Sequence, residues 1–162
     1  MESPLRNVSL VPPADGRQSD TALAVARGTA RLLRSLGFAC VGELALPSGR
    51  RADLVGVDAA GRIWIVEIKS SMADFRADQK WPDYRWHCDR LFFATSLDVP
   101  CEIFPPDAGL IVADGFGADF KCEAPEHKLP AATRKSMLLL FARAAASRLQ
   151  ALIDPAGPFQ FD

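Results

Sequence analysis

The sequence IWIVEIK at residues 63–69 is the strongest indication of the fold, because it is typical of an apolar strand that ends in two charged side chains. Its isoleucine, tryptophan and valine side chains alternate in direction, so both faces of the strand are apolar. A strand of this kind is normally central in a sheet that is covered on both sides. The same alternation places Glu67 and Lys69 on one face, where the buried strand ends.

A second strand, at residues 52–57, is predicted to pair with this one. The stretch between the two strands contains Gly61 and is typical of a tight turn, which indicates an antiparallel hairpin over 52–57 and 63–68. In that hairpin Asp53 should lie opposite Glu67. Two carboxylates and the ammonium group of Lys69 are therefore expected in one place.

Helices and further strands are predicted around this hairpin. A helix is expected from about Thr21 to Leu36, capped by Asp20 and stopped by Gly37. The other expected elements are a strand at 38–46, a helical region from Ser71 or Asp74 to about Cys88 that Pro82 interrupts, strands at 91–95, 109–113 and 118–122, and a helix from Thr133 to about Ile153. The core order α-β-β-β-α-β predicts an α/β fold, with a central mixed sheet flanked by helices.

Length and composition indicate one ordinary globular domain. The chain has 162 residues; residues 1–19 are predicted to be an extended lead-in and residues 20–162 a single domain. A net charge of −1 counts against a nucleic-acid coat protein but is compatible with an enzyme that has a local basic groove. The four scattered cysteines are typical of reduced cytosolic thiols. With neither a secretory signal nor a stretch of about 20 apolar residues, a cytoplasmic protein without a membrane span is expected.

The facing carboxylates predict a divalent-cation site. Asp53 and Glu67 repel each other unless a proton, a lysine or a cation lies between them. Their oxygens, the backbone carbonyl of Ile68 and water suit Mg²⁺ or Mn²⁺. Such an ion stabilises charge on a scissile phosphate, and Lys69 would orient the attacking water or neutralise the developing charge. Asp53, Glu67 and Lys69 are therefore the candidate catalytic residues for phosphodiester hydrolysis.

Further candidate residues lie on both sides of this pair. Glu43, on the first strand, is either an additional metal ligand or an ordinary surface carboxylate, and the sequence leaves both readings open. Lys80 and Tyr84 are spaced i, i+4, so they are predicted to share a face of the helical region, and with Arg51 they are candidates for contact with a nucleic-acid backbone. Trp81 would either stack on an unpaired base or belong to the core, and the core is favoured.

Two other charged features have simpler interpretations. Arg27, Arg31 and Arg34 form a stripe on the first helix, which is interpreted as a solvated face rather than as a phosphate-binding surface. Asp89 precedes a strand and is interpreted as one half of a structural pair with Arg90. The chain lacks the G-x-x-x-x-G-K-[ST] pattern, so no nucleotide cofactor is expected.

Two resemblances bear on the function. Ala52-Asp53 and Glu67-Ile68-Lys69 resemble the two motifs of the PD-(D/E)XK nuclease superfamily, although the proline is absent here. Three stretches, at 49–95, 109–120 and 134–149, resemble the MmcB family of bacterial DNA repair proteins. These resemblances imply a restriction-endonuclease-like fold and a role in DNA repair. They also imply DNA as a partner, with a second copy or another repair protein as further partners.

Three hypotheses follow for the function. The first is a metal-dependent DNA endonuclease of a repair pathway. The second is a binding module for DNA or for a repair protein that keeps the nuclease fold without catalysis. The third is a protein-binding scaffold in which Glu67 and Lys69 form a structural ion pair. Two facing carboxylates favour the first, because a binding protein has no need of them.

Overall fold

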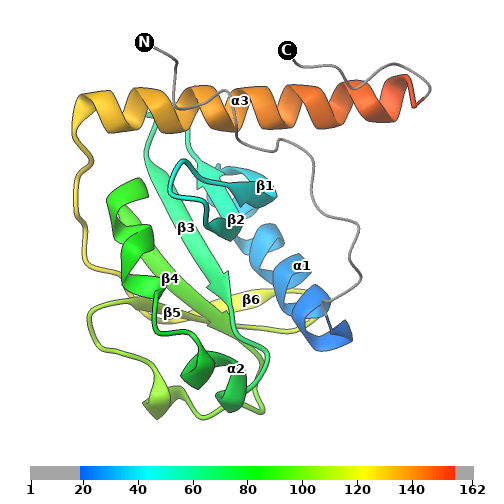
Figure 1. Ribbon diagram of the computed structural model, residues 1–162. Helices are drawn as coiled ribbons and strands as arrows, with labels where there is room; N and C mark the ends of the chain where they lie inside the picture. The colour runs from blue at the N-terminus through cyan, green and yellow to red at the C-terminus, as the bar shows by residue number, and fades with distance from the viewer. Residues whose placement is uncertain (1–18, 156–162) are drawn as a thin grey trace.

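The computed structural model describes residues 19–155, which form a six-stranded mixed sheet with helices around it (Figure 1). The elements are α1 (Asp20–Ser35), β1 (Ala39–Ala45), β2 (Arg51–Val57), β3 (Ile63–Ile68), α2 (Met72–Ala77), the 3₁₀ helix η1 (Trp81–His87), β4 (Arg90–Thr95), the 3₁₀ helix η2 (Cys101–Ile103), β5 (Gly109–Ala113), β6 (Ala118–Cys122) and α3 (Ala131–Ile153). The strands lie side by side in chain order. The α/β class and the predicted order of core elements are confirmed.

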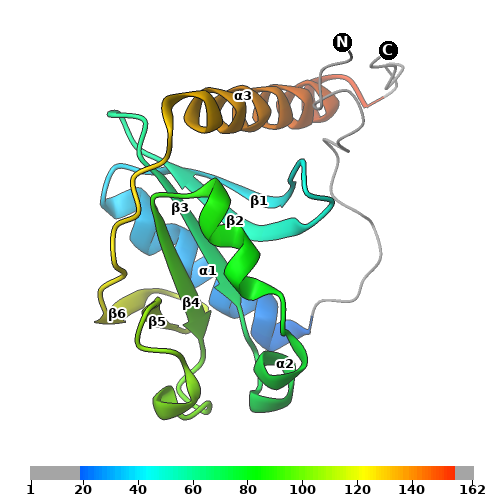
Figure 2. The same ribbon diagram turned by 60° about the vertical axis from the view of Figure 1, so that its left-hand side comes forward.

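The direction of the strands changes at β3. Strands β1, β2 and β3 form antiparallel pairs, β3, β4 and β5 are parallel to one another, and β6 returns antiparallel to β5. Because β3 to β5 are parallel, the segments that follow them leave from the same end of the sheet. Figures 1 and 2 show α2, which follows β3, at that end and α3 across the opposite end.

Side-chain alternation on β3 divides the core into two layers. Ile65 packs in a cluster with Leu140 of α3, whereas Val66 packs in a second cluster with Leu33 of α1. All four side chains are fully buried. The both-face-apolar strand is thus central, as predicted, and it carries Glu67 and Lys69 into the interior.

The beginning of α1 differs in detail from the expectation. Ser19, rather than Asp20, caps the helix, because its side-chain oxygen accepts the amide hydrogen of Ala22 at 3.1 Å. Asp20 is the first helical residue, where its negative charge favours the positive end of the helix dipole. The predicted lead-in at 1–19 otherwise lies outside the described residues.

The helical region after β3 is two separate elements. Ser71 caps the beginning of α2 by accepting the amide hydrogen of Asp74 at 3.0 Å. Asp78 is the C-cap residue of α2, and η1 begins three positions later at Trp81. The 3₁₀ geometry of η1 has about three residues per turn, so the i, i+4 spacing does not align side chains. The prediction that Lys80 and Tyr84 share a face is therefore wrong: Lys80 is exposed and Tyr84 is buried.

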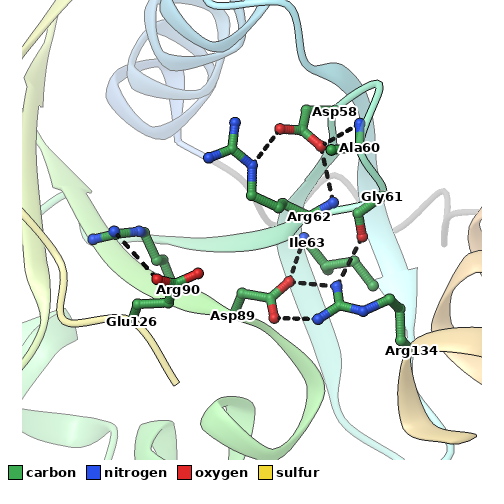
Figure 3. Close-up of polar contacts among 9 residues, drawn as sticks. All are labelled: Asp58, Ala60, Gly61, Arg62, Ile63, Asp89, Arg90, Glu126 and Arg134. Atoms are coloured by element: carbon green, nitrogen blue, oxygen red, sulfur yellow. Dashed lines mark hydrogen bonds and ion pairs between the residues drawn. The ribbon is translucent and has the colours of Figure 1, made fainter. Parts of the chain in front are cut away.

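A partly buried ion pair connects α3 to the sheet (Figure 3). Arg134 donates hydrogen bonds to both carboxylate oxygens of Asp89, at 2.7 and 2.6 Å. The same carboxylate accepts the amide hydrogens of Ile63 and Leu129 at 2.8 and 2.9 Å. Asp89 is a structural residue, as interpreted, but its partner is Arg134; Arg90 instead donates to the carbonyl of Ala124.

By length and composition alone, α3 is apolar enough to cross a membrane. This finding differs from the expectation that the chain contains no apolar stretch long enough to span a membrane. The property does not distinguish a membrane helix from one that packs on a protein core, and in this structure Met137, Leu140 and Ala144 are buried against the sheet.

Candidate active site

The site forms where β2 and β3 separate. Their backbone pairing ends at Leu54 and Val66, and beyond that point side chains replace it. The amide of Asp53 donates to Oε1 of Glu67 at 3.1 Å, and the amide of Ile68 donates to Oδ2 of Asp53 at 2.7 Å. Each carboxylate thus satisfies a backbone donor that the ladder leaves unpaired. The two carboxylates meet, as the register of the hairpin predicts.

Burial sets the protonation of this pair. Burial, with a smaller contribution from the charge of Glu43, raises the pKa of Asp53 to about 6, although the hydrogen bond from Ile68 acts in the opposite direction. Glu67 is 3% exposed, and burial followed by the charge of Asp53 holds its pKa well above the ordinary value. Near neutral pH the pair therefore favours either a retained proton or a cation between the two carboxylates.

Lys69 lies on the same face as Glu67 and is held at three points. Its amide donates to the carbonyl of Ala94 at 2.9 Å, and its carbonyl accepts the hydroxyl of Thr95 at 2.6 Å. Its ammonium group, on a side chain 8% exposed, donates to Oδ2 of Asp78 at 2.8 Å. Burial alone would raise the pKa of Asp78, but the hydrogen bonds from Lys69 and from the amide of Lys80, together with the nearby positive charges, bring this pKa below its ordinary value.

A polar cavity of about 570 Å³ opens over these groups. It is lined from β2 and β3, from α2 and its cap, from η1 and from the first turn of α1. Arg51, Lys69, Asp78 and Tyr84 all contribute to its wall, whereas Lys80 does not. Asp78 was not among the site residues predicted from the sequence, because no periodic spacing relates it to Lys69.

The residues around the carboxylate pair are connected to one another by hydrogen bonds and an ion pair. The hydroxyl of Tyr84 donates to the carbonyl of Arg51 at 2.9 Å, which places η1 against the start of β2. The guanidinium of Arg51 pairs with the carboxylate of Glu43 at 3.0 Å. Glu43 has a positive φ of 50°, and Arg148 of α3 binds its carbonyl at 2.8 Å. The assignment of Glu43 as a metal ligand stays a prediction.

The donor set fits magnesium or manganese. Within residues 19–155 no three His, Cys, Asp or Glu side chains gather in a way that would hold an ion. Mg²⁺, however, is often bound through one or two carboxylates, with water and substrate phosphates completing its shell. Asp53 and Glu67 meet that requirement, and the carbonyl of Ile68 lies in the same cavity wall.

Trp81 belongs to the core rather than to the open part of the site. Its ring meets that of Phe93 edge to face, with the centroids 5.2 Å apart. The side chain also packs against two of the buried clusters. The interpretation of Trp81 as a core residue agrees with this packing.

The comparisons with known proteins bear on the whole chain. Among solved structures, a protein of unknown function from Silicibacter pomeroyi is similar, with a TM-score of 0.85 and 44% sequence identity. The similarity covers 90% of this chain and 99% of that one. The comparison with curated proteins found no match. A family model described as DNA repair protein MmcB-like matches residues 10–156, and the chain therefore belongs to the MmcB-like family of DNA repair proteins.

Proposed function

We propose that this protein is a metal-dependent DNA nuclease that acts in DNA repair. The observation that carries the proposal is the meeting of the Asp53 and Glu67 carboxylates where β2 and β3 separate, with Lys69 on the same face of the same cavity. Membership in a DNA repair family supports DNA as the substrate. The same three residues support placing the chain in the PD-(D/E)XK superfamily.

Each residue has a distinct role in this proposal. Asp53, Glu67 and the carbonyl of Ile68 hold Mg²⁺ or Mn²⁺, which when bound stabilises charge on the scissile phosphate and lowers the pKa of water. Lys69 holds the attacking water or neutralises charge on the phosphate. Arg51, whose side chain is 42% exposed, and Tyr84 contact the DNA backbone at the cavity wall.

One observation favours a second function, a DNA-binding module without catalysis. The ammonium group of Lys69 is bound by Asp78, and each carboxylate accepts a backbone amide hydrogen. The three groups are thus satisfied within the protein. Cleavage requires Lys69 to exchange Asp78 for water or phosphate, whereas binding at the cavity rim does not.

Cleavage of labelled DNA tests the proposal. Single-stranded, duplex and branched DNA are incubated with purified protein in Mg²⁺, in Mn²⁺ and in EDTA. Cutting that requires the metal is expected on at least one of these substrates. Absence of cutting by a folded protein, combined with DNA binding that weakens steeply with salt in EDTA, contradicts the nuclease and favours the binding module.

Thermal unfolding is expected to show a pH-dependent effect of Mg²⁺. A carboxyl whose pKa is raised in the folded state favours folding only while it is protonated, so its contribution is lost as the pH rises from about 4 through the folded pKa. A rise from 3.8 to about 6 at Asp53 corresponds to about 3 kcal/mol. A bound cation would offset this loss. Mg²⁺ should therefore raise the Tm more at pH 8 than at pH 5.

The double variant Asp53→Asn, Glu67→Gln is the control for this measurement. It keeps the size of both side chains but removes their charge, so its Tm should respond little to Mg²⁺ at either pH. An equal response of the variant and the wild type at pH 8 would show that the ion binds elsewhere.

A further inference from the structure

Two large apolar side chains are exposed, one in the turn between β5 and β6 and the other shortly after β4. Phe116, within the turn, is 83% exposed, and Leu97, which follows β4, is 80% exposed. Both line the same cavity, of about 490 Å³. Exposed apolar side chains that gather at one cavity are a feature of binding sites for ligands or partners. We call Leu97 and Phe116 the apolar pair.

The turn that carries Phe116 is held rigidly. Oδ1 of Asp114 accepts the amide hydrogens of Phe116 and Gly117 at 2.7 and 2.9 Å. Arg31 of α1 donates to the carbonyl of Phe116 at 3.1 Å. A Cβ at Gly28 would lie 2.1 Å from the carbonyl oxygen of Asp114, so the backbone of α1 packs directly on the turn. Because the backbone of the turn is fixed, the position from which the Phe116 side chain projects is already set before a ligand binds.

Cations of α1 flank the apolar pair. Arg27 and Arg31 are both exposed, and the guanidinium of Arg27 would lie 3.5 Å from a Cβ placed at Gly115 in the same turn. The charge of Asp114 is directed at backbone amides of the turn. Guanidinium groups beside an exposed ring match a nucleotide, which presents phosphate oxygens and a flat apolar face.

This surface and the candidate active site are both connected to α1. The first turn of α1, at Ser19 and Ala22, lines the cavity above Glu67, and Arg27 is five residues further along the helix. Five residues correspond to about 7.5 Å along the helix axis. That length matches roughly two nucleotide steps of about 3.4 Å on one strand. Leu97 also follows β4 at the end of the sheet where Lys69 follows β3.

We infer that the apolar pair, with Arg27 and Arg31, binds an unpaired base of DNA and its flanking phosphates next to the site of cleavage. The substrate class is thus DNA with an unpaired nucleotide, such as a gap or a bulge. A paired base presents its faces to its stacked neighbours, whereas an unpaired base is free to lie on Phe116. The choice of DNA as the ligand rests on the proposed function.

Binding in EDTA tests the inference without cleavage. Fluorescence anisotropy is measured for a labelled duplex with a one-nucleotide gap and for the fully paired duplex of the same sequence. Phe116→Ala is expected to weaken binding of the gapped DNA by about fivefold to 150-fold, which corresponds to the loss of about 1–3 kcal/mol of stacking on one base. Leu97→Ala should act in the same direction, and binding of the paired duplex should change less than about twofold.

Trp86→Ala is the matched control. Trp86 is 76% exposed on η1, yet it lies outside both the active-site cavity and the cavity of the apolar pair. Its removal should leave both affinities unchanged. Unchanged thermal unfolding of each variant checks the fold.

Several outcomes overturn the inference. The first is an equal loss of affinity for the gapped and the paired DNA. The second is an unchanged affinity for gapped DNA in both Phe116→Ala and Leu97→Ala. The third is a homodimer, detected by light scattering, that Phe116→Ala disrupts, which would assign the surface to a second copy of the chain. If the wild type cleaves DNA and both variants bind normally, the inference alone fails. If the selective loss occurs but no substrate is cut, the nuclease proposal fails and the binding surface stands.

Discussion

Asp53→Asn and Glu67→Gln are each expected to lower Mg²⁺-dependent DNA cleavage by about 100-fold to 1000-fold or more, with the fold intact. Each change removes one of the two charges proposed to hold the ion while leaving an oxygen that still accepts a hydrogen bond. Because the two carboxylates act on one ion, the double variant should be little worse than either single variant. Initial rates of cleavage at saturating Mg²⁺ measure the effect.

The stability of the same variants should change in the opposite direction. In EDTA at pH 8, the wild type keeps two desolvated carboxylates close together, and burial is the main cause of their raised pKa values. Neutralising one of them relieves that cost, so Glu67→Gln is expected to raise the Tm. A protein that loses activity because it unfolds would show the reverse.

Glu123→Gln is the matched control, because it makes the same chemical change at an exposed position outside the cavity. It should leave both cleavage and Tm unchanged. Cleavage that persists in both Asp53→Asn and Glu67→Gln would rule out the proposed mechanism.

Arg134→Ala is expected to lower the free energy of unfolding by about 3 kcal/mol or more. The change leaves the carboxylate of Asp89, on a side chain 2% exposed, without the cation that binds both of its oxygens. It also frees the beginning of α3 from the turn at Gly61, whose carbonyl Arg134 binds at 2.8 Å. Urea denaturation followed by circular dichroism measures the loss.

Arg62→Ala provides the comparison for this prediction. Arg62 pairs with Asp58 at 2.6 Å in the same region, but its side chain is 59% exposed (Figure 3). Exposed ion pairs contribute about 0–1 kcal/mol, so this variant should lose no more than that. Similar losses in the two variants would mean that burial does not set the strength of the Asp89–Arg134 pair.

Local sequence patterns were enough to predict the sheet around β3 and the meeting of the carboxylates. Alternation of side chains along a strand and the chemistry of a short turn are local properties, so the turn at Gly61 was enough to bring Asp53 opposite Glu67. The apolar character of both faces of residues 63–68 was enough to place this strand in the centre. The two-residue spacing likewise set Lys69 on the face of Glu67.

The groups from distant parts of the chain that complete these features depend on how the elements pack together. Asp78 reaches Lys69 and Arg134 reaches Asp89 because separate elements pack together, and no periodicity in the chain relates such positions. The 3₁₀ form of η1 turned Tyr84 inward and left Lys80 outside the cavity, since helix type changes which residues share a face. The exposure of Phe116 depends on how α1 packs on the β5–β6 turn. Packing between segments far apart in sequence is a property of the whole fold, and local patterns do not encode it.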